Sequence, residues 1–217
     1  MHHSLLHRAI WYYPVHKLIH PLRSFSFQGE KLSYFIHRYN ATWKNERAVE
    51  IPIVWNEVEK AYEKQLAVLE IGNVLSHYFK ISHRVIDKYE EADQVENIDV
   101  TEIPKTKKYD LIIAISTLEH VGWDEKQKDS KKIEKAIHHL LSLLNTNGKL
   151  IITGAFGQNP HFDSLFLSDQ QKCKKTFLKR ISYWNSWKEV NQSVIEDAKY
   201  GHPFWNGNGL VIAIFKK

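Results

Sequence analysis

The segment Ala67-Val68-Leu69-Glu70-Ile71-Gly72 is a short, mostly apolar run that stops at a glycine. A run of this length that ends at a turn residue predicts a buried strand. Similar runs predict further strands at residues 84–87, 96–100, 110–116, 149–153 and 210–215. The run at 110–116 (DLIIAIS) is continuous and β-branched, which is typical of a central strand covered on both faces.

Helical patterns alternate with these strands. Residues 53–66 repeat apolar side chains at helical spacing, and residues 129–144 form a stronger apolar stripe. Asp129 or Ser130 can cap the start of the second helix, and Asn147-Gly148 predicts its end and a turn of the chain. Strands that alternate with helices predict a parallel α/β sheet with helices on both faces. Ligands of such sheets lie outside the carboxyl ends of the strands, so we expect the functional residues there.

The amino-terminal part of the chain is basic and aromatic. Of 217 residues, the first 50 hold seven Lys or Arg, three Asp or Glu and six of the 13 histidines. We expect residues 1–52 to form a helical extension and residues 53–217 to form the α/β domain. The histidines lack the tight ligand spacing of a metal site, so we expect no metal. Residues 172–188 are also basic and aromatic, and their apolar spacing predicts a surface helix.

The remaining composition suits a cytoplasmic protein. Cys173 is the single cysteine, which excludes a disulfide framework. No apolar run approaches the roughly 18 residues that cross a bilayer. No cleavable signal pattern is evident. We therefore expect a soluble, cytoplasmic protein without a transmembrane segment.

Glu70-Ile71-Gly72 places an acid two residues before a glycine, in the first turn of the predicted sheet. This pattern resembles the opening motif of class I S-adenosylmethionine-dependent methyltransferases. The resemblance implies a Rossmann-like, doubly wound, mostly parallel sheet of seven strands, the last of them antiparallel. It also implies S-adenosylmethionine as the cofactor, with Glu70 near its ammonium group and with Gly72 and Asn73 beneath it. Glycine suits this place because a β-carbon would collide with the ligand.

Later strands continue the resemblance, which spans about residues 66–155. Asp87 matches the family's acid that accepts hydrogen bonds from the ribose hydroxyls, and a carboxylate offers two acceptor oxygens for them. Asp99, which Val100 follows, matches the acid that receives the adenine amino group. Ser116 and Thr117 leave the fourth strand beside the cofactor. These residues are the expected cofactor contacts.

Two features depart from the family pattern. The family's opening motif carries two further glycines, where this chain has Val74 and Ser76. The 15 positions from Gly72 to Asp87 leave little room for a helix, and residues 88–95 are too few for a long one. An NAD site is less well supported, because the Gly-x-Gly-x-x-Gly phosphate turn is absent.

The stretch Leu118-Glu119-His120-Val121 resembles one that is common in small-molecule methyltransferases. A positioned base adds about 10²–10⁴-fold when the methyl acceptor is a hydroxyl. We expect His120 to be this base and Glu119 to orient it or contact the acceptor; the alternative is a packing role for His120. The expected acceptor is a small-molecule or glycan-like compound, methylated at oxygen, because the Asn/Asp-Pro-Pro-Tyr/Phe motif of base-amine methylation is absent. Loops at residues 156–161 and 204–206 are expected to border the acceptor.

Two other functions stay open at this point. A catalytically inactive, methyltransferase-like binding or scaffold module would account for Val74 and Ser76. An RNA methyltransferase would use residues 1–50 as a basic arm that neutralises phosphates. The rest of the chain is nearly neutral, so we do not expect a nucleic-acid partner.

Overall fold

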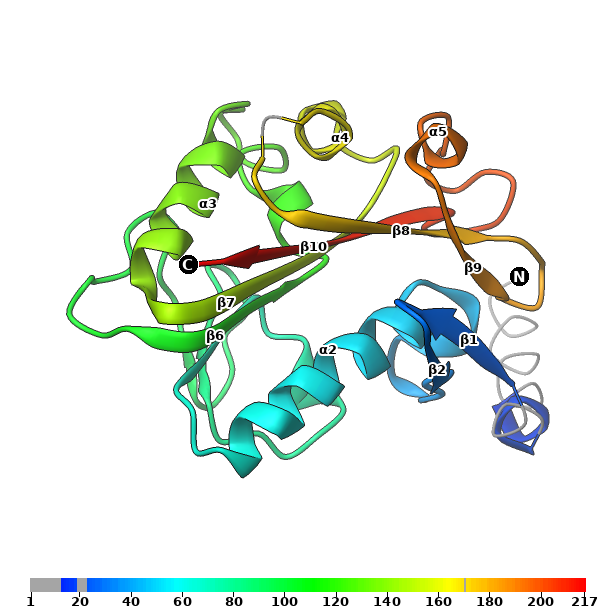
Figure 1. Ribbon diagram of the computed structural model, residues 1–217, viewed down its shortest axis with the longest axis horizontal. Coiled ribbons are helices and arrows are strands. Elements are labelled where there is room, and N and C mark those ends of the chain that lie inside the picture. The colour runs from blue at the N-terminus through cyan, green and yellow to red at the C-terminus, as the bar shows by residue number, and fades with distance from the viewer. Residues whose placement is uncertain (1–12, 19–22, 170) are drawn as a thin grey trace.

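The computed structural model describes residues 13–18, 23–169 and 171–217 (Figure 1). Within these ranges the chain forms an eight-stranded sheet in the order β5-β4-β3-β6-β7-β10-β8-β9. Its parallel strands are β3 (Val68–Ile71), β4 (Arg84–Ile86), β5 (Val95–Glu96), β6 (Tyr109–Ile115) and β7 (Leu144–Ala155). The last strand, β10 (Gly209–Lys216), is antiparallel to β7 and to β8 (Lys174–Arg180), and β8 pairs with β9 (Trp187–Val190). The predicted mostly parallel, Rossmann-like α/β fold with an antiparallel last strand is confirmed, with one strand more than expected.

The direction of the strand order reverses beside β3. The chain runs from β3 outward to β4 and β5, and then returns to the other side of β3 to form β6 and β7. In open α/β sheets this reversal opens a crevice at the carboxyl ends of the strands. Here that edge follows residues 71, 86, 96 and 115.

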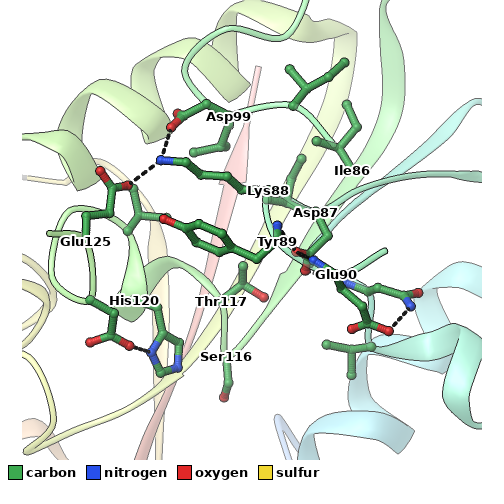
Figure 2. Close-up of a pocket in the computed structure, with 18 residues that line it drawn as sticks. Ile86, Asp87, Lys88, Tyr89, Glu90, Asp99, Ser116, Thr117, His120 and Glu125 are labelled. Atoms are coloured by element: carbon green, nitrogen blue, oxygen red, sulfur yellow. Dashed lines mark hydrogen bonds and ion pairs between the residues drawn. The ribbon is translucent and has the colours of Figure 1, made fainter. Parts of the chain in front are cut away.

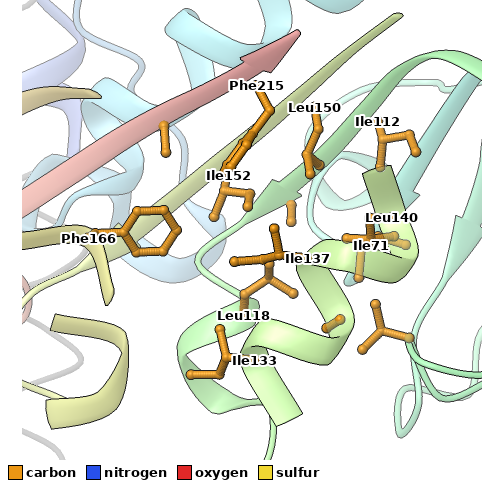
Figure 3. Packing of buried hydrophobic residues seen from close by; sticks show 14 of the residues in the cluster. Ile71, Ile112, Leu118, Ile133, Ile137, Leu140, Leu150, Ile152, Phe166 and Phe215 are labelled. Carbon is orange, nitrogen blue, oxygen red and sulfur yellow. The ribbon is translucent and has the colours of Figure 1, made fainter. Parts of the chain in front are cut away.

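Helices cover both faces of the sheet (Figure 1). One face carries α3 (Lys132–Leu143), α4 (Pro160–Leu167) and α5 (Gln192–Ile195). Figure 3 shows Ile133, Ile137 and Leu140 of α3 packed towards the isoleucines and leucines of this face. The apolar stripe predicted for residues 129–144 therefore faces the core.

The opposite face is covered by α2 (Arg47–Glu63) and by the hairpin of β1 (Ser24–Phe27) and β2 (Glu30–Ser33). Two clusters of buried apolar residues result, one on the side of α3 (the α3 cluster) and one on the side of α2 (the α2 cluster). Strand β6 contributes to both, because Ile112 belongs to the α3 cluster while Leu111 and Ile113 belong to the α2 cluster. Alternate residues of a strand point to opposite faces. The prediction of a central strand buried on both faces is confirmed.

The amino-terminal prediction differs from the structure in two ways. Residues 24–33 form a hairpin rather than a helix, and Gln28 and Gly29 make its turn with φ of 51° and 86°. Positive φ at both central residues is the geometry of a two-residue hairpin turn. Helix α2 begins at Arg47 instead of residue 53 and includes Pro52 in its second turn, so it continues across the predicted boundary between residues 52 and 53.

The surface helix predicted within residues 172–188 is wrong, because β8 and β9 occupy this stretch. Phe177 packs in the α3 cluster and its neighbour Leu178 packs in the α2 cluster. Adjacent side chains on opposite faces follow the period of a strand. Both faces of β8 are covered, so both Phe177 and Leu178 are apolar. Two adjacent apolar residues fit a helical spacing as well as a strand.

The connections near the crevice are short, as the spacing predicts. Between β3 and β4 the chain forms only the 3-10 helix η3 (Leu75–His77), and residues 87–108 contain no helix. Helix α3 ends at Leu143, before the predicted Asn147-Gly148, and Asn147, whose φ is 64°, lies within β7. None of the helices in the described ranges has the length and apolar character that a membrane-spanning helix needs.

Candidate functional site

A cavity of about 510 Å³ lies at the carboxyl edge of the sheet, where the strand order reverses (Figure 2). Its walls come from the segments that follow β3, β4, β5 and β6. Eight of the ten predicted site residues line it, namely Gly72, Asn73, Asp87, Asp99, Val100, Ser116, Thr117 and His120. Glu70 and Glu119 are not among the lining residues.

Gly72 makes the turn that leaves β3. Its φ is +83°, and a Cβ at this position would lie 2.2 Å from Oγ1 of Thr117. The Gly72 N–H also donates to the carbonyl of Ile86 on the neighbouring strand, at 2.8 Å. A positive φ and a close neighbour both exclude larger residues. Glycine at residue 72 therefore allows the turn after β3 to pack against Thr117, which follows β6.

Glu70 orders the loop after this turn from below. Its buried Oε1 accepts hydrogen bonds from the main-chain N–H groups of Val74 (3.0 Å) and Leu75 (2.8 Å). Its Oε2 lies 2.8 Å from Nε2 of His83, which in turn contacts the hydroxyl of Tyr62 on α2. Glu70 thus holds the loop, and its place near a cofactor ammonium stays a prediction. No sequence motif identifies His83 and Tyr62 as partners of this carboxylate.

Val74 and Ser76 leave the cavity open. Val74 forms part of its wall, and Ser76 is not among the lining residues. The Ser76 hydroxyl donates instead to Oδ1 of Asn73. Leu75, between them, is fully buried in the α2 cluster. The loop therefore packs on α2 without the family's further glycines.

Asp87 lies at the end of β4 with its carboxylate in the cavity wall. Oδ1 accepts the main-chain N–H groups of Tyr89 and Glu90, both at 2.8 Å, and Oδ2 accepts that of Asn73 at 3.1 Å. A carboxylate offers about four acceptor positions. Oδ2 keeps one position for a ligand hydroxyl, which agrees with the role that the resemblance implies.

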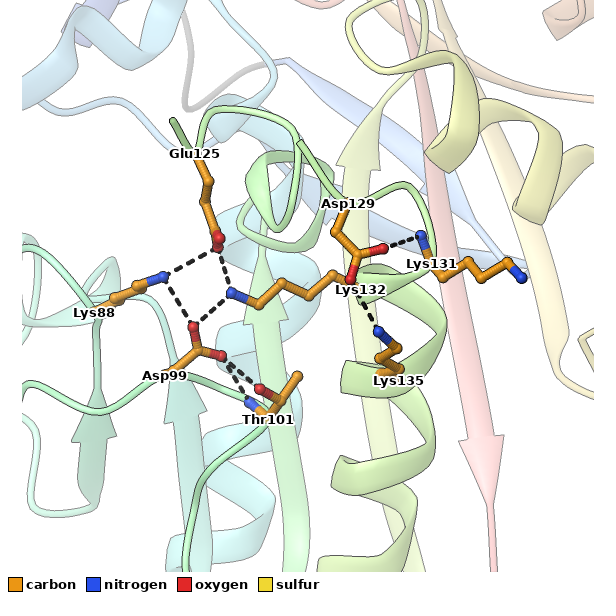
Figure 4. Close-up of polar contacts among 8 residues, drawn as sticks. All are labelled: Lys88, Asp99, Thr101, Glu125, Asp129, Lys131, Lys132 and Lys135. Atoms are coloured by element: carbon orange, nitrogen blue, oxygen red, sulfur yellow. Dashed lines mark hydrogen bonds and ion pairs between the residues drawn. The ribbon is translucent and has the colours of Figure 1, made fainter. Parts of the chain in front are cut away.

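Asp99 is already saturated (Figure 4). Oδ1 accepts the N–H and the hydroxyl of Thr101, at 3.1 and 2.8 Å. Oδ2 accepts the ammonium groups of Lys132 (2.6 Å) and Lys88 (2.9 Å). Burial acts to raise the pKa of Asp99, but the two lysines and Thr101 outweigh it and hold this pKa below its usual range. Asp99 has no acceptor position left for an adenine amino group in this arrangement.

Lys88 closes a ring of four charges at this end of the cavity. Both Lys88 and Lys132 contact Oε1 of Glu125, at 3.1 and 2.5 Å, as well as Asp99. Figure 2 shows the Lys88 side chain extended towards Asp99 and Glu125. Lys88 lies two residues after the end of β4 and lines the cavity. No sequence motif points to Lys88, Lys132 or Glu125.

His120 lies at the mouth of the cavity and pairs with Asp124. Its Nδ1 lies 2.6 Å from Oδ2 of Asp124, and the side chains are 42% and 55% exposed. The carboxylate can only accept, so Nδ1 carries the donated proton and the Nε2 lone pair is left for another group. Asp124, four residues along the chain from His120, makes the contact with the ring that was predicted for Glu119.

Glu119 is the middle residue of the 3-10 helix η4 (Leu118–His120), and its side chain is buried. Burial raises the pKa of its carboxyl group to about 7. Among the described residues, no group donates to its Oε2. Its main-chain carbonyl accepts the side-chain amide of Asn159 at 2.7 Å, which fixes this turn against the start of α4. The side chain does not line the cavity, and its contact with the acceptor stays a prediction.

Ser116 connects the cavity to a buried charge on α2. Its φ is 39°, and its hydroxyl donates to Oε1 of Glu50 at 2.6 Å. The hydroxyl of Thr153 on β7 donates to the same oxygen at 2.5 Å, and Arg47 pairs with the other oxygen. The fully buried Glu50 carboxylate thus has three donors, which compensates its desolvation. This anchor was missed because residue 50 was assigned to the extension.

The predicted acceptor loops lie apart from the cavity. Phe156 is buried in the α3 cluster, and Asn159 caps α4. Trp123 packs against His161 with ring centroids 6.0 Å apart. In the other loop, Trp205 is 77% exposed. None of these five residues lines the cavity.

The sequence matches no protein-family model and no curated protein. Solved structures do resemble the fold. A S-adenosylmethionine-dependent methyltransferase from Archaeoglobus fulgidus has 14% identity and a TM-score of 0.47, with 79% of this chain and 96% of that chain covered. The N-methyltransferase NodS from Bradyrhizobium japonicum, in complex with S-adenosylhomocysteine, has 10% identity and a TM-score of 0.45 over 78% and 88%. Coclaurine N-methyltransferase has 14% identity and a TM-score of 0.44 over 79% and 73%. These likenesses are distant, and the fold assignment rests on the strand order and directions of this chain.

Proposed function

We propose that this protein is an S-adenosylmethionine-dependent methyltransferase that acts on a small-molecule or glycan-like acceptor, at oxygen. The observation that carries the proposal is the cavity at the strand-order reversal, with Asp87 in its wall and the His120–Asp124 pair at its mouth. The volume of about 510 Å³ lies within the usual range for small-ligand sites. A proton acceptor beside such a site suits group transfer to a hydroxyl.

The residues present fit the cofactor at most points. Apolar side chains for the flat faces of an adenine are provided by Ile71, Ile86, Ile98, Val100 and Val121. Asp87 keeps an acceptor position for a ribose hydroxyl. Asp99 fits only after one of its two lysine partners has moved. When bound, S-adenosylmethionine supplies an electrophilic methyl group on a sulfonium sulfur.

The roles of the chain's own residues follow from these positions. Gly72 and Thr117 hold the two sides of the crevice together, and Ser116 is fixed from behind by Glu50. His120 would take the proton of the acceptor hydroxyl at Nε2, while Asp124 holds the ring and stabilises its charged form. Most of the rate enhancement would come from alignment, which supplies roughly 7–11 kcal/mol in well-oriented systems.

Calorimetric titration with S-adenosylmethionine and S-adenosylhomocysteine tests the proposal. We expect saturable binding of both by the unmodified protein, and a loss of about tenfold or more in Asp87→Ala, because hydrogen bonds to a charged group are worth about 1.5–3 kcal/mol. Asp93→Ala is the matched control, since Asp93 is an exposed acid in the same connection outside the cavity. Absence of heat and of a thermal shift with both compounds would overturn the proposal.

The saturated Asp99 favours a second candidate, a methyltransferase-like module that binds a partner and has lost the cofactor. This candidate expects no binding of either compound, even after Lys88 is removed. It also expects cellular function to survive Asp87→Ala and to be lost when residues 1–50 are deleted. The same titrations therefore separate the two candidates.

A further inference from the structure

A second concave site lies on the α2 side of the sheet. It is a groove of about 660 Å³ between α2, the β1–β2 hairpin and strands β7 and β10, with residues 172–174 at its end. It shares no residue with the cavity described above. Its apolar lining consists of Phe27, Leu32, Ile53, Ile151, Ile212 and Ile214. The groove is therefore a separate feature with an apolar floor.

Strand register places lysines at one end and along one side of this floor. Ile151 on β7 is opposite Ile214 on β10, and two residues further along Lys149 is opposite Lys216. Directly opposed residues in an antiparallel pair share a face, and like charges in such a pair are destabilising. Lys174 on β8 is opposite Ile214 from the other side. The sheet thus holds cations next to an apolar centre, where a bound anion would be stabilised.

The groove carries an excess of positive charge. Its lining includes five lysines, Lys60, Lys149, Lys172, Lys174 and Lys216, but only two acids, Glu30 and Glu57. Glu57 is shared between Lys60 and Lys149. Lys174 donates to a neutral group, the Gln28 side-chain carbonyl, at 2.7 Å. No ion pair within the described ranges includes Lys172 or Lys216. These two ammonium groups are available to a ligand.

We propose that the groove binds an anionic amphiphile of small-molecule size, an acyl chain with one anionic head group. The apolar floor would accept the chain, and Lys172 and Lys216 would contact the head group. The volume of about 660 Å³ suits a single small molecule, and the hollow shape between helix, hairpin and sheet suits an enclosed chain better than a flat membrane surface. The site is independent of methyl transfer, so it stands or falls separately from the proposed function.

Cys173 offers a reporter for this site. It is the single cysteine of the chain, it lines the groove and it is half-buried. The experiment measures how fast an uncharged disulfide reagent modifies Cys173 in the full-length protein, with decanoate as the probe below its micelle concentration. We expect saturable protection by decanoate that weakens as salt rises, because salt screens exposed charges. Decanol and inorganic phosphate, which each lack one half of the chemistry, should protect far less.

The charge contribution is tested with Lys172→Gln/Lys216→Gln. We expect its half-protecting decanoate concentration to rise about fivefold or more, since each exposed charge contact contributes modestly. The control Lys126→Gln/Lys131→Gln removes two exposed lysines outside the groove and should behave like the unmodified protein. Equal protection by decanol, equal protection by phosphate, no saturable protection by decanoate, or equal effects of the two double variants would each overturn the proposal. Thermal unfolding of each variant, and direct calorimetry with decanoate, keep a folding defect from being read as a binding defect.

Discussion

Nε2 of His83 lies 2.8 Å from Oε2 of Glu70, and both side chains are almost completely buried. The other Glu70 oxygen holds the N–H groups of Val74 and Leu75, so His83 is joined through one carboxylate to the loop that borders the cavity. In the resembled family, this loop is rich in glycine. Here a buried side-chain contact organises it instead, and this explains how the turn forms with Val74 and Ser76 in it.

His83→Ala should lower the free energy of unfolding by roughly 2–3 kcal/mol, because a buried hydrogen bond to a charged acceptor is lost. Urea unfolding at neutral pH measures it. Glu70→Gln in the same chain should recover part of the loss, since a neutral amide is cheaper to leave unpaired than a carboxylate. A double-mutant cycle that gives purely additive effects would contradict the direct contact.

Gly72→Ala should be more damaging than Gly201→Ala. Both glycines have positive φ, but a Cβ at residue 72 meets Thr117 while residue 201 has nothing within 4 Å. The difference in unfolding free energy should be about 1–3 kcal/mol, the usual cost of forced overpacking. Adding Thr117→Ala to Gly72→Ala should restore part of it, because the nearest atoms belong to the Thr117 side chain. Equal costs at residues 72 and 201 would show that strain alone decides.

The sheet could be predicted from the sequence because each core strand is a short apolar run between turn residues. The run at 110–116 needed only its own composition, since both of its faces are covered. The β1–β2 hairpin was missed because Gln28-Gly29 is not one of the strong hairpin dipeptides. Strand β8 was missed because two adjacent buried residues imitate a helical stripe. The local hydrophobic pattern therefore predicts an element best where the segment fits only a helical or only a strand period.

The site could be predicted only where it follows strand ends. Asp87 and Ser116 leave β4 and β6 directly, so topology places them in one crevice. The partners of Ser116 and Asp99 come from distant parts of the chain: Glu50 reaches Ser116 over 66 positions, and Lys132 reaches Asp99 over 33. Such contacts depend on how helices dock on the sheet, which no local spacing specifies. The contact between Asp124 and His120 is local by comparison, because the two residues are only four positions apart. A spacing of this kind can be recognised in a sequence.

Lys88→Met should strengthen the binding of S-adenosylhomocysteine if the proposed function holds. The substitution keeps the apolar stem of the side chain and removes the ammonium group that occupies Asp99. The gain should be up to about fivefold, since a partly exposed ion pair is worth about 1 kcal/mol or less. Calorimetric titration measures it, with Lys135→Met as the control because Lys135 pairs with Asp129 outside the cavity. Weaker binding by Lys88→Met alone would mean that Lys88 itself contacts the ligand.

Glu119 makes the stability of the protein depend on pH. Burial raises its pKa to about 7 from an ordinary value of 4.5, so the folded state holds its proton more tightly than the unfolded state does. The resulting stabilisation is complete below pH 4.5 and is lost as pH rises through 7. Glu119→Gln is neutral throughout and cannot suffer this loss. The difference in unfolding free energy between Glu119→Gln and the unmodified protein should therefore grow in favour of the variant by about 3 kcal/mol between pH 4.5 and 8, at about 1.4 kcal/mol per pKa unit.

Urea unfolding at several pH values measures this difference directly. Comparison with the unmodified protein cancels other titrating groups, such as Asp163, whose pKa burial raises to about 6. Glu134→Gln, on the exposed side of α3, should show no growing difference. A constant difference for Glu119→Gln across the range would mean that the carboxylate finds a donor or water in solution. In that case the Oε2 atom, which no described residue hydrogen-bonds, would be accessible to solvent or to a ligand. The predicted contact between Glu119 and the methyl acceptor would then be supported.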